Sequence, residues 1–384
     1  MNELSLVPGS EKLLELCGFL RAEGYLSTQR IPSQRRPLWK LAAELQVLGD
    51  YRAGTTHCFS SSALPGSYMK SFLRGRPKLE TLYRLFFLNQ TVPLSIASNA
   101  LPALLMNHLS ADGVLDVTDG VKSRFRLVPW RDSLLLSDPD EGPERQREHY
   151  VYVGGDSTVL SDFVTRRVGN RSFRRGLDLC AGTSIQAHNL VENCDALVAA
   201  EYNPRAVAFS RVNAAINGLE NSIHAVESNL WEYVEGTFDI IVSNPPYLPM
   251  PDEKLSTSNL DVCGGTDYGM NIPVEIFRGM ARFLNTDGYG VFLAASPVIG
   301  GRSLLHERLA PLASELGLSA VMNAWNYTDL ILDREYQRRE NISYFVFHII
   351  EVTRECPGRI RTVHLPWIHR SALILNASFR KFMP

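Results

Sequence analysis

Residues 238–249 read FDIIVSNPPYLP, an apolar run followed at once by the motif Asn244-Pro245-Pro246-Tyr247. The apolar run predicts a buried strand, and the two prolines end it because proline has no backbone N–H to donate to a sheet. The motif therefore stands at the exit of the strand. Strand termination alone would account for the prolines, so the meaning of the motif depends on what precedes it.

A second predicted strand, GLDLCA at 176–181, leads into a turn that contains Gly182. Glycine lets the backbone approach a ligand closely, and Asp178 is placed to accept a hydrogen bond from an ammonium group. Only Gly182 remains of a Gly-x-Gly-x-x-Gly-like spacing. On its own this loop is better interpreted as a plain turn between a strand and a helix.

About twenty residues further on, the strand ALVAAE ends in Glu201. A carboxylate at this place can accept two hydrogen bonds from the hydroxyls of a ribose, as in dinucleotide-binding folds. A glutamate at a strand end is also an ordinary solvated residue. The loop and Glu201 support each other, because together they account for both ends of a nucleoside cofactor.

Strands and helices alternate through the second half of the chain, which predicts an α/β fold with a doubly wound, Rossmann-like parallel sheet. Such sheets bind their ligands at the carboxyl ends of the strands. The further predicted strands are 222–228, 288–296 and 343–352, and the predicted helices are 184–194, 204–219 and 274–284.

With these motifs, the region from roughly 150 to 350 resembles the class I S-adenosylmethionine-dependent methyltransferases that carry N-P-P-Y. Among these are the release-factor glutamine methyltransferases and the adenine amino-methyltransferases. LDLCAGTS (177–184) matches the cofactor loop of the family, and SNLW (228–231) matches the position near the adenine. CGGTDYGM (263–270) is similar to the Gly-Gly-x-Asp-Gly stretch of the glutamine-modifying branch.

The resemblance implies S-adenosyl-L-methionine as the cofactor and no metal. The cofactor-binding residues that it implies are Asp178, Ala181, Gly182, Thr183, Glu201, Tyr202, Asn229, Leu230 and Asn244. The catalytic residues that it implies are Asn244, Pro245 and Tyr247.

In the mechanism that the resemblance implies, the acceptor nitrogen donates its two N–H bonds to the side-chain oxygen of Asn244 and the carbonyl of Pro245. Tyr247 stacks on a flat acceptor group and excludes water. Methyl transfer from a sulfonium needs orientation and electrostatics more than a strong base.

Three residues depart from the family pattern. Cys180 and Ser184 replace the usual glycines, and Asn229 replaces an aspartate near the adenine. We expect cofactor binding to survive, because serine can still turn the chain and the amide of asparagine still offers an acceptor.

Composition narrows the class of protein. The 384 residues carry a net charge of -2, which gives no general field for holding a polyanion. No run approaches the ~18 apolar residues of a membrane span, and the N-terminus does not read as a secretory signal. Six cysteines without a C-x-x-C pair favour reduced thiols over a zinc site or disulfides, so we expect a cytoplasmic protein without a membrane partner.

The expected domains are a helical and winged-helix-like module at 1–137, a linker at 138–150, a Rossmann-like domain at 151–352 and an extension at 353–384. In the module, Leu13, Cys17 and Leu20 fall on one helix face.

A strand at 121–129 would place Lys122, Arg124 and Arg126 on one face, either as a nucleic-acid wing or, more commonly, as a solvated face. Gly154 to Ser157 are interpreted as either a lid or a plain hairpin.

Three functions compete. The first is methylation of a nitrogen on a small molecule or short peptide in specialised metabolism, which the near-neutral charge and the extra module favour. The alternative is a macromolecular acceptor, either a protein glutamine or an amino group of nucleic acid, although weak charge disfavours nucleic acid. The third is a non-catalytic winged-helix regulator that senses the cofactor. A homodimer is compatible with the N-terminal module.

Overall fold

The computed structural model describes residues 10–30, 73–139, 150–248, 265–328 and 334–364. Contacts between residues divide the chain into two units. Unit 1 comprises Met1–Thr158, Gly182–Asn189 and Glu201–Glu227, and unit 2 comprises Val159–Ala181, Leu190–Ala200 and Ser228–Pro384. Each unit has a buried apolar core of its own. None of the helices among the described residues is long and apolar enough to cross a membrane.

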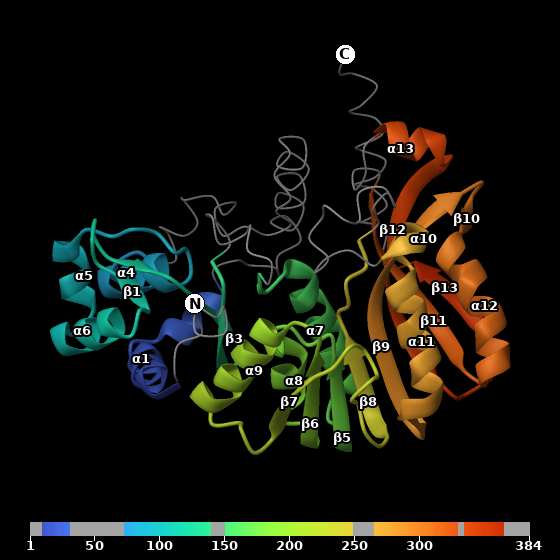
Figure 1. The fold of residues 1–384 in the computed structure, drawn as a ribbon, viewed down its shortest axis with the longest axis horizontal. Coiled ribbons are helices and arrows are strands. Elements are labelled where there is room, and N and C mark those ends of the chain that lie inside the picture. Colours follow the sequence, from blue (N-terminus) through green and yellow to red (C-terminus); the bar gives the residue numbers. More distant parts are fainter. Residues whose placement is uncertain (1–9, 31–72, 140–149, 249–264, 329–333, 365–384) are drawn as a thin grey trace. The chain divides into compact units, whose positions relative to one another are not determined.

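Unit 1 begins with short helices that pack on one another. The predicted stripe of Leu13, Cys17 and Leu20 is confirmed, since all three side chains are buried. Pro93 and Pro102 stand just before two of the helices, where a missing N–H costs no helical hydrogen bond. The helices are α1 Ser10–Ala22, the 3-10 helix η2 Tyr25–Arg30, α4 Pro77–Phe86, α5 Leu94–Ala100 and α6 Ala103–Ala111 (Figure 1).

Two hairpins follow, and they correct the predicted single strand at 121–129. β1 (Leu115–Asp116) pairs with β2 (Lys122–Ser123), and β3 (Arg126–Trp130) pairs with β4 (Ser133–Ser137), both antiparallel. The chain turns between β2 and β3 because the hydroxyl of Ser123 donates to the carbonyl of Phe125 and accepts from its N–H. Such a local side-chain bond competes with the strand ladder.

The predicted basic face is therefore wrong. Lys122 and Arg124 are exposed, but the turn reverses the alternation and Arg126 is buried, 4% exposed. The guanidinium of Arg126 lies over the ring of Phe87, 4.1 Å from its centroid. Three basic side chains do not share one surface here.

Unit 1 also contains α8 (Ile185–Leu190) for most of its length, α9 (Pro204–Ile216) and β7 (Ile223–Glu227). Phe209 and Ile216 of α9 belong to the same apolar core as the N-terminal helices. The side-chain amide of Asn213 bonds both the N–H and the carbonyl of Leu136 on β4.

A buried ion pair joins α9 to the end of β4. The Nε of Arg205 donates to Asp138 Oδ2 at 3.2 Å, and its Nη2 donates to Oδ1. Asp138 also accepts the N–H of Val151. Asp138 and Tyr150, the first and last residues of the expected linker, are both buried, and 140–149 lie outside the described residues.

Unit 2 is built on a sheet, and the predicted α/β class is confirmed. Parallel pairing joins β6 to β5, β5 to β8 and β8 to β9, while β12 runs antiparallel to both β9 and β11. Its strands follow in the order β13-β11-β12-β9-β8-β5-β6, with the short β10 (Arg302–Ser303) on β9. Their bounds are β5 Phe173–Leu179, β6 Cys194–Glu201, β8 Phe238–Ser243, β9 Leu284–Ile299, β11 Ser319–Thr328, β12 Ile342–Thr353 and β13 Ile360–His364.

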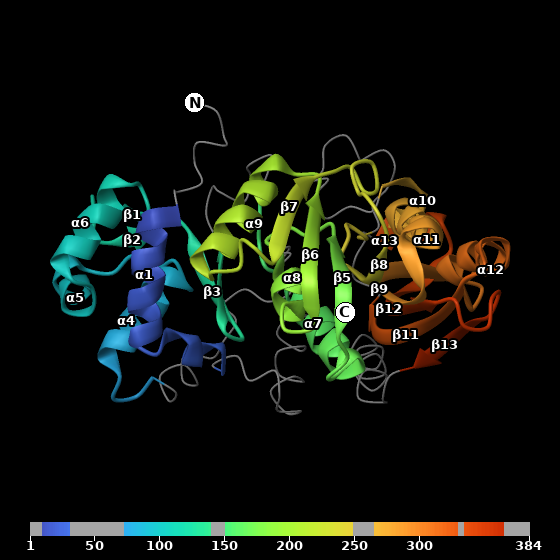
Figure 2. The same ribbon diagram turned by 90° about the horizontal axis from the view of Figure 1, so that it is seen from below.

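Helices α11 (Asn271–Phe283) and α12 (Leu304–Leu316) lie on one face of this sheet (Figure 2). Their apolar residues pack on the strands, including Phe277 and Leu309. Ser303 caps the start of α12, and Gly317 ends the helix at φ 64, a conformation that favours glycine. Unit 2 also contains two short helices, α10 (Thr266–Gly269) and α13 (Arg334–Arg339).

Two further predictions, for residues 154–157 and for the C-terminal extension, can be compared with the structure. Residues 154–157 do not form the hairpin, because helix α7 (Gly155–Val168) begins there, and the alternative of a lid stays a prediction. Within the expected C-terminal extension, β13 pairs in parallel with β11, and 365–384 lie outside the described residues. The expected domain boundaries stay a prediction.

The buried pair of unit 1 gives a test. Asp138→Ala leaves the guanidinium of Arg205 buried without a carboxylate, so we expect the free energy of unfolding to fall by about 3–5 kcal/mol in urea titrations. Glu307→Ala removes the partner of Arg302, whose side chain is 77% exposed, and should cost less than about 1 kcal/mol. Equal losses in the two variants would contradict the account.

Candidate active site

The parallel pairing of β5 and β8 brings two distant motifs to one edge of unit 2. Asp178 lies opposite Val242, and Leu179 lies opposite Ser243, so the cofactor loop and N-P-P-Y leave the sheet side by side. The hydroxyl of Ser243 donates to the carbonyl of Leu179 at 2.7 Å. Asp178 is fully buried in β5.

The cofactor loop turns through the left-handed region three times in five residues. Cys180, Gly182 and Ser184 have φ of 58°, 54° and 61°. Two of these are the positions where the family usually has glycine, so the chain keeps the turn without the glycines. A non-glycine residue in this region costs about 1–2 kcal/mol, and only Gly182 adopts it freely.

Neighbouring bonds hold the loop. In unit 2, Ala181 is buried and its N–H donates to the carbonyl of Ala200 at 3.1 Å. In unit 1, Thr183 is buried, and its carbonyl accepts from the side-chain amide of Asn213 at 3.1 Å. A Cβ built on Gly182 would meet no heavy atom within 4 Å, so the space over this residue is open.

Glu201 ends β6 with its carboxylate fixed by backbone donors. Oε2 accepts the N–H of Gly182 at 2.8 Å, and Oε1 accepts the N–H of Asn203 at 2.8 Å. Burial raises the pKa of Glu201, while the N–H groups of Asn203, Gly182 and Tyr202 act against that rise. Each carboxylate oxygen has a second lone pair, so it can still accept a hydroxyl. Within unit 1 the structure therefore brings Gly182 and Glu201 into contact, and their binding of a cofactor stays a prediction.

The residues after Glu201 start α9. Asn203 caps the helix, because its side-chain oxygen accepts the N–H groups of Arg205 and Ala206. Tyr202, the other predicted cofactor residue of this segment, is 69% exposed.

Asn229 and Leu230 lie in a tight turn of unit 2. Asn229 is exposed, and Leu230 is half-buried with φ 51°. The hydroxyl of Ser228 donates to the carbonyl of Leu230 and accepts the N–H of Tyr233, which fixes the turn.

The acceptor motif follows β8. Asn244 is half-buried, Pro245 is buried and Tyr247 is only 6% exposed. Tyr247 packs edge-on against the ring of Phe347 on β12, with centroids 5.9 Å apart and an angle of 84° between the rings. The expected stacking of Tyr247 on an acceptor stays a prediction.

The stretch expected to follow the motif is described from Gly265 onward, and 263–264 lie outside the described residues. Asp267 and Tyr268 both have left-handed backbones, with φ of 52° and 58°. Arg308 of α12 donates to both carboxylate oxygens of Asp267, at 3.0 and 3.1 Å, and the hydroxyl of Tyr268 donates to Glu340 at 3.0 Å. These bonds hold a conformation that glycine would adopt more readily.

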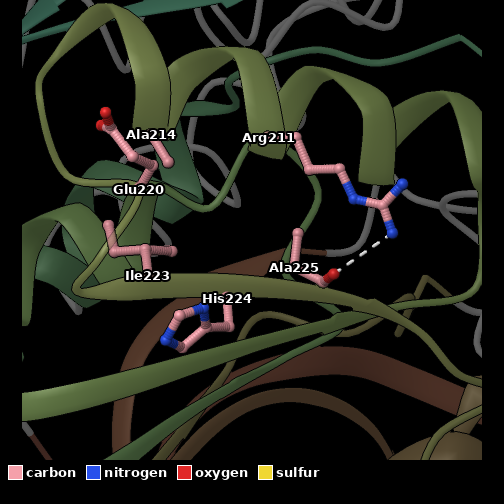
Figure 3. Close-up of a pocket in the computed structure, with 6 residues that line it drawn as sticks. All are labelled: Arg211, Ala214, Glu220, Ile223, His224 and Ala225. Atoms are coloured by element: carbon pink, nitrogen blue, oxygen red, sulfur yellow. Dashed lines mark hydrogen bonds between the residues drawn. The ribbon is translucent and has the colours of Figure 1, made fainter.

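A shallow pocket of about 230 Å³ lies elsewhere, in unit 1 between α9 and β7. None of the predicted site residues lines it; its lining residues are Arg211, Ala214, Glu220, Ile223, His224 and Ala225. Figure 3 shows Arg211 reaching the backbone carbonyl of Ala225, at 3.4 Å. Among the described residues no group of three His, Cys, Asp or Glu could hold a metal ion.

His188 is a buried residue of unit 1. Its Nδ1 lies 3.0 Å from the hydroxyl of Ser133, and burial lowers its pKa to about 3. The imidazole is therefore neutral near neutral pH, and it shares a hydrogen bond with the hydroxyl of Ser133.

Sequence reasoning missed Ser243 and Phe347. A serine at the last position of a strand that precedes a functional motif is a usable signal. Phe347 gives no local signal, because it lies a hundred residues after Tyr247 and only the sheet brings the two rings together.

A model of the methyltransferase small domain matches residues 152–259. The ribosomal protein uL3 glutamine methyltransferase of Neisseria gonorrhoeae is 34% identical over 160 residues, which cover 37% of this chain and 53% of that protein. A protein of Methanocaldococcus jannaschii, provisionally named as a protein N5-glutamine methyltransferase, is 34% identical over 141 residues, which cover 34% of this chain and 69% of that protein. The crystal structure of Trm5b from Pyrococcus abyssi has a TM-score of 0.40 and 15% identity over 60% of this chain and 56% of that one, too distant to bear on function.

The sheet, the loop after β5 and the motif after β8 define a class I methyltransferase domain. Since the chain covers more than two thirds of the archaeal relative, it belongs to the S-adenosylmethionine-dependent methyltransferases of the release-factor glutamine methyltransferase group. The chain spans about half, or less, of the length of the first curated relatives it matches, at 53%, 39% and 39%.

The open space over Gly182 leads to a prediction. Gly182→Ala should cost about 1 kcal/mol of stability through its positive φ, and should weaken binding of S-adenosylhomocysteine about tenfold because the new methyl group fills that space. Isothermal titration and urea unfolding measure the two effects. Gly300→Ala is the matched control, since Gly300 has φ 57° and equally open surroundings in the turn after β9. Equal binding by both variants would contradict the role of Gly182.

The raised pKa of Glu201 gives a second prediction. Its carboxylate must be ionised to accept hydroxyls on both oxygens, so affinity for S-adenosylhomocysteine should fall as the pH drops through this raised pKa. The free energy of unfolding changes with pH in the opposite direction from the affinity. Because the folded state binds the proton of Glu201 more tightly than the unfolded state, this group stabilises the fold at low pH, and the contribution is lost as the pH rises. A titration of the dissociation constant between pH 4.5 and 7.5 measures the first effect, and Glu201→Gln should bind weakly without that pH dependence.

Proposed function

We propose that the protein transfers a methyl group from S-adenosylmethionine to the side-chain amide nitrogen of a glutamine in a protein. The observation that carries this proposal is the position of Asn244 and Pro245, which leave β8 directly beside the end of β5 and its cofactor loop. The names of the relatives favour a protein glutamine, which was the alternative, over the small-molecule acceptor placed first from the sequence.

Within unit 1, the residues present fit the ribose part of the cofactor. Glu201, with a backbone N–H on each carboxylate oxygen, would accept from the ribose hydroxyls, and the open space at Gly182 admits a ligand close to the backbone. In unit 2, the resemblance implies that Asp178 accepts from the ammonium group and that Asn229 lies near the adenine. When bound, S-adenosylmethionine supplies an activated methyl group on a sulfonium.

The acceptor residues have the chemistry that an amide nitrogen needs. Its lone pair is delocalised into the carbonyl group, so the nitrogen is a poor nucleophile until it is made tetrahedral. In the proposed reaction the Asn244 side-chain oxygen and the Pro245 carbonyl accept its two N–H bonds and aim the lone pair. Because Pro246 has no N–H and a restricted φ, it keeps the preceding carbonyl fixed. The proton leaves once the nitrogen has been methylated and become acidic.

The structure removes the basic surface that had supported a nucleic-acid acceptor. The basic face of Lys122, Arg124 and Arg126 does not form, because Arg126 is buried against Phe87. The net charge of -2 adds no general attraction for a polyanion.

The proposal predicts that Asn244→Ala lowers turnover by about 10²-fold or more, the usual loss for an oriented hydrogen-bonding group at a reacting centre. Transfer of labelled methyl to protein measures the turnover. Asn285→Ala is a suitable control, because that amide bonds Asp239 near the start of β8 rather than its exit. Turnover unchanged in Asn244→Ala, or lowered equally in both variants, would refute the assignment.

A further inference from the structure

Two phenylalanines share one face of β12 next to the acceptor motif. Phe345 and Phe347 are two residues apart, so their side chains leave the strand on the same side. The ring of Phe347 meets the ring of Tyr247 edge-on, at 84°. This is a favourable arrangement for two aromatic rings, and it leaves Tyr247 6% exposed while Phe347 stays half-buried.

The register of the sheet explains why these rings meet. The last residue of β8, Ser243, lies opposite Phe292 of β9. Phe347 lies opposite Ala295, three residues further along β9. Phe347 therefore stands just beyond the exit of β8, at the level that the N-P-P-Y motif occupies.

A second cluster that contains aromatic rings packs at the end of β12 beside the motif. Phe345, Tyr336 and Ile342 form a buried cluster, and the ring of Tyr268 packs against it. The hydroxyl bond from Tyr268 to Glu340 secures the cluster on the side of α10. Figure 1 shows α10 and α13 at this end of β12. Packing and this hydrogen bond therefore hold the end of β12 that carries Phe347.

We propose that Phe347 is a positioning residue for the acceptor, acting through Tyr247. The inference rests on the proposed function and adds to it the role expected for Tyr247, whose ring would stack on the acceptor amide and exclude water. Its ring cannot do so from several orientations, and Phe347 restricts it to one. Substituting Phe347 therefore loosens acceptor binding, while the cofactor loop and the fold are left as they are.

The test compares Phe347→Leu, Phe347→Tyr and the unchanged protein in methyl transfer to the protein fraction of an extract of the source organism. We expect Phe347→Leu to raise the apparent KM for the extract by about three- to tenfold, the scale of one aromatic contact, with kcat within about twofold. Phe347→Tyr, which keeps the ring, should restore the KM. The melting temperature and the affinity for S-adenosylhomocysteine should stay unchanged.

Two comparisons separate this role from a merely structural one. Phe163→Leu is the matched control, because Phe163 is also a half-buried ring of unit 2 but lies under Arg167. In addition, the double variant Tyr247→Leu/Phe347→Leu should be no worse than Tyr247→Leu alone, since Phe347 acts through Tyr247. An unchanged KM in Phe347→Leu, an equal effect in Phe163→Leu, or additive effects in the double variant would overturn the inference.

The results also show whether the role of Phe347 or the proposed glutamine methylation is wrong. Label on a residue other than glutamine would overturn the proposed function, while the change in KM would still decide the role of Phe347. Label on glutamine with an unchanged KM would overturn the inference alone. No label in any fraction would overturn both.

Discussion

In unit 2, β5 and β8 pair in parallel with Asp178 opposite Val242, and every proposed step of the chemistry depends on that pairing. It sets the exit of the cofactor loop beside the exit of the acceptor motif, although the two lie more than sixty residues apart in the chain. The bond from Ser243 to the carbonyl of Leu179 fixes the two exits against sliding. Methyl transfer relies on orientation more than on acid–base groups, so a rigid strand pair supplies most of what it needs.

The cofactor loop shows how the chain tolerates departures from the family pattern. Cys180 and Ser184 adopt the left-handed backbone that glycine would adopt at no steric cost. Their strain persists because the surroundings determine the loop, through Ala181 bonded to Ala200 in one unit and Gly182 bonded to Glu201 in the other. The one remaining glycine stands where the space over the backbone is open.

Much of the candidate site was proposed from the sequence, because local residue types at a fixed spacing indicate it: Gly182 after one strand, Glu201 after the next and Asn244 after a third. The parallel part of the sheet was predicted from the alternation of strands and helices along the second half of the chain. Arg126 was not predictable from alternation, since the side chain of Ser123 turns the chain within the expected strand. The contact of Phe347 with Tyr247 depends on the antiparallel placement of β12, which no local pattern in the sequence expresses.

The most direct test of the account is to locate the methyl group. The protein is incubated with methyl-labelled S-adenosylmethionine and an extract of the source organism, and the labelled product is sequenced by mass spectrometry. The account predicts label on the side-chain nitrogen of a glutamine in one or a few proteins. Label in a low-mass compound or in nucleic acid would contradict it.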